Sequence, residues 1–147
     1  MVTVRDLLRN KGGDVWSVSP ETTMIDTLHL LAKKDVGALM VTKEGKIVGV
    51  VSERDFVRSI AQTGQCLLYS TVERYMTTEI STVTPDQSIE QCMQLMTDRH
   101  IRHLPVLENE KLIGVISIGD VVRELISNKQ LTINQLEDYI QGRTYPA

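Results

Sequence analysis

The sequence predicts an α/β fold built from two similar halves, each with a small sheet covered by helices. Three observations predict it: an internal repeat at a spacing of 65 residues, apolar runs of strand length, and apolar stripes at helical spacing. The chain has 147 residues, 41% apolar and 24% charged, as in ordinary globular proteins. Two copies are too few for a solenoid, so we expect two halves related by a pseudo-twofold axis.

The repeat aligns residues 15–60 with residues 80–125 without a gap. Its most similar stretches are GVVSERDFVR in the first copy and GVISIGDVVR in the second. Upstream, TVRDLL returns as TVERYM 68 residues later, so the first copy carries three extra residues near its start. We therefore divide the chain into a first motif over 1–64, a second motif over 65–128 and a tail over 129–147.

Each half is expected to begin with a helix and a short strand, followed by a second helix. A Ser-Pro or Thr-Pro pair predicts that this second helix starts at Pro20 and at Pro85, with the hydroxyl residue as its cap. Apolar residues then recur at i, i+3, i+4 and i+7, beginning at Met24 in the first half and at Ile89 in the second.

A hairpin is expected after this helix in both halves. The apolar runs cover 38–41 and 47–51 in the first half, and 104–107 and 112–116 in the second, with tight turns between them. Their continuous apolar character indicates sheets that are covered on both faces. A last helix follows each hairpin directly.

The start of this last helix carries a Ser and, three residues later, an Asp in both copies: Ser52 with Asp55, and Ser117 with Asp120. One interpretation is an N-cap with a weak capping box. The other is a nucleotide site, because a helix N-terminus attracts phosphate and a nearby carboxylate can accept hydrogen bonds from a ribose diol. Spacing alone leaves both interpretations open.

The whole arrangement resembles a tandem pair of CBS domains, named from cystathionine β-synthase. The family's signature of glycine, apolar, any, Ser or Thr, any, any, Asp is present at 49–55 and again at 114–120. The family's V-x-P entry is present at Val18 and Val83, and its apolar-Pro-Val strand at 104–106. The resemblance covers nearly the whole chain and implies a stand-alone pair of motifs, each roughly β-α-β-β-α.

The resemblance implies an adenosine ligand (AMP, ADP, ATP, NAD or S-adenosylmethionine) in the cleft between the two motifs. The two Asp residues would hold ribose hydroxyls, the two Ser residues would contact phosphate, and backbone near the strand starts would frame the adenine. The expected nucleotide-binding residues are Val18, Ala38, Leu39, Ser52, Arg54, Asp55, Val83, Arg102, His103, Leu104, Pro105, Ser117 and Asp120.

The basic residues of this set make the two sites unequal. Arg102 and His103 immediately precede the second motif's strand, where we expect them to meet a phosphate, and their counterparts Gly37 and Ala38 carry no charge. Arg54 is a further phosphate candidate in the first signature. We therefore expect the second motif to serve a polyphosphate or a dinucleotide. Beside the first site, the single Trp16 is either a partly buried anchor or a stacking platform for a base.

Several function classes are not favoured by the sequence. The net charge of -3 gives no reason to expect a nucleic-acid or anionic membrane partner, and no apolar run is long enough to cross a bilayer. The N-terminus is charged and unlike a secretory signal, so the expected compartment is the cytoplasm. Cys66 and Cys92 have no partners at metal-ligand spacing, and Cys92 is expected to be a core residue. Neither a catalytic set nor a Walker loop is present.

The predicted function is therefore a non-enzymatic sensory or regulatory module that binds an adenine nucleotide and controls its own dimer or a partner protein. The alternative is a ligand-free protein–protein interaction module in which the Ser and Asp pairs are only helix caps. Beyond the second motif, Ile133, Leu136 and Ile140 have the spacing of a short helix with one apolar stripe. This stripe packs either on its own module or across a dimer twofold, and we expect a homodimer.

Overall fold

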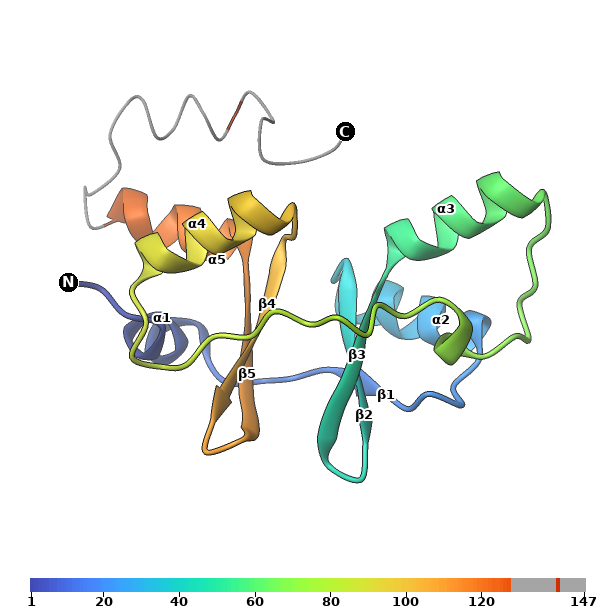
Figure 1. Ribbon diagram of the computed structural model, residues 1–147, viewed down its shortest axis with the longest axis horizontal. Coiled ribbons are helices and arrows are strands. Elements are labelled where there is room, and N and C mark those ends of the chain that lie inside the picture. Colours follow the sequence, from blue (N-terminus) through green and yellow to red (C-terminus); the bar gives the residue numbers. More distant parts are fainter. Residues whose placement is uncertain (128–139, 141–147) are drawn as a thin grey trace. The chain divides into compact units, whose positions relative to one another are not determined.

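The computed structural model describes residues 1–127 and residue 140, which fall into two compact units (Figure 1). Unit 1 combines Met1–Asp14 with the chain from Ser81 onward, and unit 2 consists of Val15–Ile80. Each unit contains a small sheet and helices, so the predicted α/β fold with one sheet in each half is confirmed.

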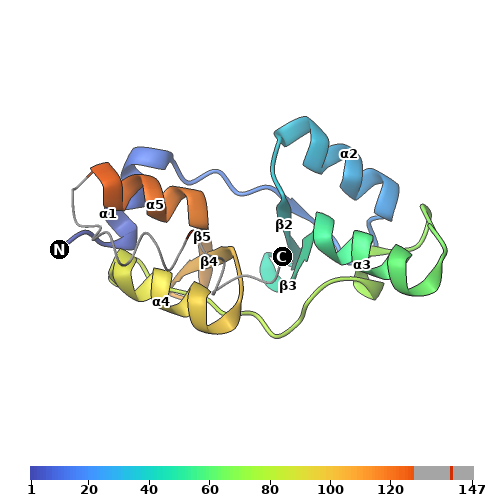
Figure 2. The ribbon, with the colours of Figure 1, turned by 90° about the horizontal axis from the view of Figure 1, so that it is seen from above.

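Unit 2 holds a three-stranded sheet in the order β1-β2-β3, with β1 parallel and β3 antiparallel to β2. The helices α2 and α3 contact each other. Figure 2 shows both helices beside the strands β2 and β3. The elements of unit 2 are β1 (Ser17–Val18), α2 (Met24–Lys34), β2 (Ala38–Lys43), β3 (Lys46–Ser52), α3 (Glu53–Thr63) and the 3₁₀ helix η1 (Val72–Arg74). Its buried core is formed by Val18, Met24, Leu31, Leu39, Val41, Val51, Phe56 and Val72.

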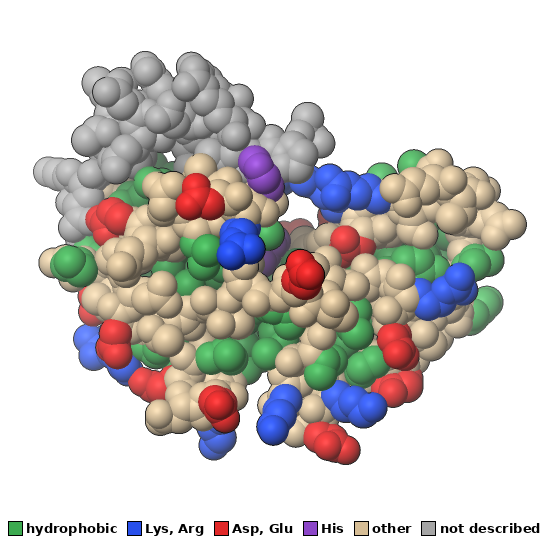
Figure 3. All heavy atoms as spheres, viewed as in Figure 1, with side chains coloured by type: hydrophobic (Ala, Val, Ile, Leu, Met, Phe, Trp, Pro, Cys, Tyr) green, Lys and Arg blue, Asp and Glu red, His purple; other side chains and the backbone are tan. Residues whose placement is uncertain are grey.

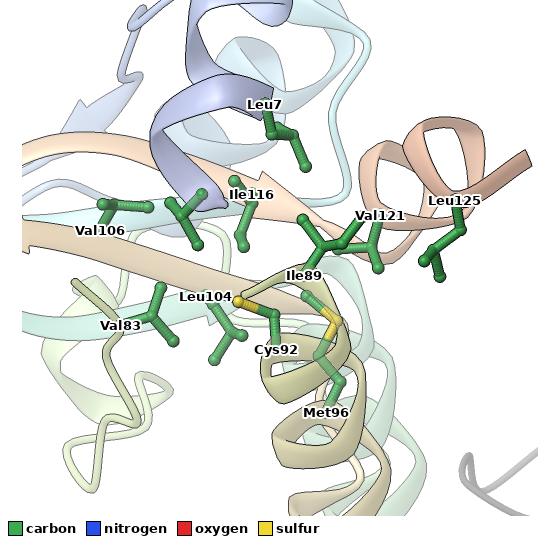
Figure 4. Packing of buried hydrophobic residues seen from close by; sticks show 11 residues of the cluster. Leu7, Val83, Ile89, Cys92, Met96, Leu104, Val106, Ile116, Val121 and Leu125 are labelled. Carbon is green, nitrogen blue, oxygen red and sulfur yellow. The ribbon is translucent and has the colours of Figure 1, made fainter. Parts of the chain in front are cut away.

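Unit 1 holds the antiparallel hairpin β4-β5, to which Val83 adds a parallel bridge at Val106. Its elements are α1 (Val4–Lys11), α4 (Ile89–Arg99), β4 (His103–Glu108), β5 (Lys111–Ser117) and α5 (Ile118–Ser127). Figure 4 shows side chains from all three helices and both strands pointing into one core. Cys92 lies in this core with 0% exposure, as predicted.

Both hairpins turn through residues in the left-handed region of backbone conformation. In the first, Glu44 and Gly45 have φ of 52° and 78°; in the second, Asn109 and Glu110 have φ of 52° and 65°. Two consecutive residues with positive φ are the pattern of a type I′ turn, whose twist matches that of the strands it joins. The predicted tight turns are confirmed.

The predicted starts of the second helices were wrong. α2 begins at Met24 and α4 at Ile89, each four residues after the proline. The caps are Thr23 and Ser88, whose hydroxyls accept hydrogen bonds from backbone N–H groups three residues on. A proline at the second position of a β-turn is as favourable as one at the first position of a helix, and here the prolines lie in turns.

The segment before each copy of the repeat packs in the unit formed by the other copy. Residues 1–14 precede the first copy but belong to unit 1, and residues 65–80 precede the second copy but belong to unit 2. In unit 1, Leu8 of α1 packs against Gly114 of β5, where an added Cβ would lie 2.8 Å from Leu8 Cδ2. In unit 2, Met76 lies in the same way against Gly49, where an added Cβ would lie 2.7 Å from its sulfur. Leu8 and Met76 are repeat equivalents, so the same close approach is made twice. The division at residues 64 and 65 stays a prediction about the motifs; the compact units follow the packing of these segments.

Acidic and basic side chains are mixed over the visible face of each unit (Figure 3). Among the described residues, no helix is long and apolar enough to cross a membrane. The predicted tail helix lies outside the described residues, apart from Ile140, which is 73% exposed.

Candidate functional site

In unit 2 the first signature forms the junction between β3 and α3. Ser52, the last residue of β3, is the register partner of Ala38, the first residue of β2. The backbone N–H of Glu53 donates to the carbonyl of Gly37 over 3.0 Å. The start of one strand, the end of its neighbour and the first turn of α3 therefore meet at one place.

Asp55 is held against this junction by a complete capping box. Its Oδ2 accepts from Ser52 N over 2.7 Å and from Ser52 Oγ over 3.0 Å, while Asp55 N donates to Ser52 Oγ over 3.3 Å. An ionised carboxylate has about four acceptor positions. Both bonds use Oδ2, and among the described residues none donates to Oδ1, so Asp55 keeps acceptor capacity for a ligand.

Unit 1 repeats this geometry at the β5–α5 junction. Ser117 is the register partner of His103, and the N–H of Ile118 donates to the carbonyl of Arg102 over 2.9 Å. Asp120 Oδ2 accepts from Ser117 N over 2.8 Å, and Asp120 N donates to Ser117 Oγ over 3.2 Å. The capping interpretation is thus correct for both copies in this structure, with Asp in the position that Glu or Gln more often takes.

Two cations distinguish the second junction from the first. Lys11, the last residue of α1, contacts Asp120 Oδ2 over 2.6 Å and also donates to the carbonyl of Val115. Arg123, one turn further along α5, contacts Asp120 Oδ1 over 2.6 Å. The Asp120 side chain is only 8% exposed, whereas those of Lys11 and Arg123 are 33% and 75% exposed. Both carboxylate oxygens of Asp120 are therefore occupied.

The ionisation of this cluster follows from its contacts. Burial works to raise the pKa of Asp120, but hydrogen bonds from Lys11 and from Ser117 outweigh it, so the pKa lies below its ordinary value. The pKa of His103 is also lowered, first by burial and then by the positive charge of Lys11. These two effects favour the neutral form of His103, whose ring has one donor and one acceptor nitrogen.

The other predicted site residues are distributed over the two units. Leu39 and Leu104 have 0% exposure and are core residues of their units. Val18 pairs with Val41 rather than with the strand start at Ala38. The remaining predicted positions are placed as follows: Arg54 in the first turn of α3, Val83 at its bridge to Val106, and Pro105 within β4.

Lys11 was missed by sequence reasoning, because it lies 109 residues from Asp120 and outside the repeated stretch. Arg123 carried a detectable signal, since it lies three residues after Asp120 on one helix and recurs as Arg58 in the first copy. Trp16 is 39% exposed and the ammonium of Lys34 lies 3.9 Å from its ring centroid, which agrees with a partly buried anchor.

The sequence model of the CBS domain matches this chain over residues 4–62 and again over residues 72–127. The chain belongs to the CBS-domain family. Each match begins in the segment that packs into the other unit, so a CBS sequence motif here is not the same set of residues as a compact unit.

Relatives support the same assignment. CBSX3, a mitochondrial CBS domain-containing protein of Arabidopsis thaliana, is 36% identical over 150 residues, covering 95% of this chain and 72% of its own length. The crystal structure of the CBS-domain protein ATU1752 from Agrobacterium tumefaciens is 37% identical with a TM-score of 0.81, covering 84% of this chain and 98% of that one. CBSX2, crystallised in complex with AMP, is 29% identical with a TM-score of 0.71, covering 88% of this chain and 99% of that one.

Proposed function

We propose that this chain is an adenine-nucleotide-binding regulatory module without a catalytic activity of its own. AMP, ADP, ATP, NAD and S-adenosylmethionine are the candidate ligands. The support is a pair of signatures in equivalent geometry, together with the AMP complex of the related CBSX2.

The observation that carries the proposal is the state of Asp55. Its carboxylate is fixed by Ser52 through one oxygen, and the other oxygen has no donor among the described residues. A ribose diol can donate two hydrogen bonds to such an oxygen without displacing any group of the protein. Asp55 can therefore cap α3 and bind a ribose at the same time.

The test is thermal unfolding and calorimetric titration with each candidate ligand. A ligand at about 100 times its dissociation constant adds roughly 2.7 kcal/mol to stability, several degrees in the midpoint for a chain of this size. Asp55→Asn keeps the shape of the side chain and removes its charge, and it should weaken binding by tenfold or more, on the order of 1.4 kcal/mol.

A matched control separates loss of a ligand contact from loss of a cap. Asp6 forms the same box with Thr3, with bonds of 3.0 and 3.1 Å to its Oδ2, but lies outside both signatures. Asp6→Asn should therefore lower stability like Asp55→Asn and leave ligand affinity unchanged. If the two variants lower affinity equally, Asp55 acts through its cap and not through a ligand contact. If no candidate shifts the midpoint, the ligand-free interaction module is the better explanation.

We further propose that ligand binding acts on a homodimer or on a partner protein, by favouring the state for which the ligand has higher affinity. Val57 on α3 and Ile126 on α5 are 64% and 57% exposed, and we take them as candidate contact residues for this association. Sedimentation velocity with and without the ligand found above tests this. A monomer under both conditions would contradict the homodimer.

A further inference from the structure

The second signature contains a cation that the first lacks, and this difference bears on what the second signature can bind. Lys11 reaches Asp120 from α1, at the opposite end of the chain. The residue in the equivalent position before the second repeat is Glu79, which has the opposite charge. The repeat therefore does not explain why an ammonium lies beside Asp120. The capping of α5 does not explain it either, because Ser117 and Asp120 complete the cap by themselves.

Asp120 has little capacity left for a ribose diol. Its Oδ2 accepts from Ser117 and from Lys11, and its Oδ1 accepts from Arg123. Of about four acceptor positions, three are used, compared with two at Asp55. A nucleoside that bound Asp120 through both hydroxyls would have to remove a cation from a carboxylate that is only 8% exposed.

Lys11 is held more firmly than Arg123. It has two acceptors, the Asp120 carboxylate and the Val115 carbonyl, and its side chain is 33% exposed. Arg123 makes its contact from a side chain that is 75% exposed, and such a surface pair contributes little. An ammonium has three N–H donors, so Lys11 retains one for a further acceptor.

Lys11 and Arg123 both contact the single carboxylate of Asp120, so these three side chains together have one more positive than negative charge. An anionic group next to Lys11 would be attracted by this excess, whereas a neutral nucleoside would gain nothing from it.

We propose that Lys11 makes the second signature selective for phosphate-bearing adenosine ligands over the neutral nucleoside. This rests on the proposed function and deepens it. Asp120 then acts as the positioning residue of Lys11 in addition to capping α5. A nucleotide gives the ammonium an anionic partner when it binds, while adenosine has to compete with the ammonium for Asp120 without offering one.

The experiment isolates the second signature with Asp55→Asn and measures the dissociation constants of AMP and adenosine by calorimetry. In Asp55→Asn, adenosine should bind more weakly than AMP. Adding Lys11→Met, which keeps the length and removes the charge, should reduce the adenosine-to-AMP ratio of dissociation constants about tenfold. Arg9→Met is the matched control, because it removes one charge from the same helix at a residue that contacts Asp6 and not Asp120.

The outcomes separate the inference from the proposed function. If the unmodified chain binds neither AMP nor adenosine, the proposed function fails. If it binds AMP but the ratio is the same in Asp55→Asn with and without Lys11→Met, the inference is wrong and the function stands. The inference is also wrong if Asp55→Asn abolishes all binding, or if Arg9→Met lowers the ratio as much as Lys11→Met does. Far-UV circular dichroism confirms that each variant is folded.

Discussion

The two signatures have the same residue pattern and the same capping geometry, yet their carboxylates are in different electrostatic environments. Within the described part of the chain, the Asp55 carboxylate accepts hydrogen bonds from Ser52 alone, whereas the Asp120 carboxylate also contacts Lys11 and Arg123. Arg58 is the counterpart of Arg123 but makes no such contact in unit 2. The comparison shows that a sequence repeat preserves backbone geometry more faithfully than charge.

The source of the difference is the segment that precedes each repeat. In unit 1 this segment is α1, an eight-residue helix with a capping box at its start and Lys11 at its end. In unit 2 the equivalent segment forms only the three-residue helix η1. A longer helix of different charge, packed on the same glycine, is enough to change what surrounds the Asp carboxylate.

The largest loss of stability is expected at the two glycines where the segment before each copy of the repeat packs against a strand. Gly49→Ala would place its Cβ 3.1 Å from the Thr77 carbonyl as well as against the Met76 sulfur, so we expect a loss of about 2 kcal/mol of stability. Gly114→Ala meets only the end of the Leu8 side chain and should cost about 1 kcal/mol. Urea unfolding measures both.

The control for these glycines is Gly37→Ala, where no atom lies within 4 Å of the added Cβ. It should change stability by no more than about 0.5 kcal/mol. Leu8→Ala combined with Gly114→Ala should cost less than the sum of the two single changes. Strict additivity would mean that Leu8 does not restrict this position.

The ion pairs predict a difference in stability between the two carboxylates. Asp55→Asn weakens one cap, while Asp120→Asn weakens a cap and removes the partner of two cations, so it should cost about 1 kcal/mol more. The difference should shrink at high salt. A double-mutant cycle with Lys11→Met provides the check: if Lys11→Met costs as much in Asp120→Asn as in the unmodified chain, the two residues are not coupled.

The pH dependence should differ between the units, because His103 has Ala38 as its counterpart. The folded pKa of His103 lies below 6.5, its ordinary value. On acidification the unfolded chain therefore takes up the proton first, and the free energy of unfolding falls as the pH drops below about 6.5. The slope of the free energy of unfolding against pH that is due to His103 corresponds to the uptake of at most about one proton. This slope disappears below the pKa of His103 in the folded chain.

The measurement is the urea midpoint between pH 8 and pH 5 for the unmodified chain and for His103→Gln. The glutamine variant should lose less stability over this range. Lys11→Met should give an intermediate result, since it removes one of the charges that lower the pKa of His103. Identical profiles for all three would mean that His103 titrates as it does in the unfolded chain.

The smallest expected effect concerns Trp16, whose counterpart in the other copy is Ser81. Lys34→Met removes the ammonium from the ring face and should cost roughly 0.5 kcal/mol, as for an exposed cation–π contact. Trp16 is the single tryptophan, so its fluorescence reports the change directly. An unchanged emission spectrum would show that Lys34 does not cover the ring in solution.

The elements of the fold were predicted from sequence where local signals agree. The spacing of apolar residues and the turn residues predicted the hairpins. The Ser at each strand–helix junction predicted the starts of α3 and α5. The starts of α2 and α4 were predicted four residues early, because a hydroxyl followed by proline fits a β-turn as well as a helix start. Thr23 and Ser88, with Asp26 and Gln91 three residues later, were the better cap signals.

The geometry of the candidate site was predictable in part. The register that joins Ala38 to Ser52 and His103 to Ser117 follows from the hairpins, so these two pairs of predicted residues lie side by side. The exchange of the preceding segments was not predictable, because nothing local in α1 specifies which hairpin it covers. The Lys11–Asp120 contact depends on that exchange and was invisible for the same reason.

The exchange of segments also sets an order for the appearance of the two units during synthesis. Unit 2 is contiguous, so all of its residues are available once Ile80 has been made. α1 is made first, yet its contact with Asp120 spans 109 residues, roughly 5–20 s of elongation at ordinary ribosomal rates. Until the part of unit 1 that begins at Ser81 emerges, the buried face of α1, with Val4 and Leu7, has none of its partners, and α5 completes this set last. The contact between α1 and α5 therefore forms late in synthesis. During this interval α1 is an exposed amphipathic helix of the kind that chaperones bind.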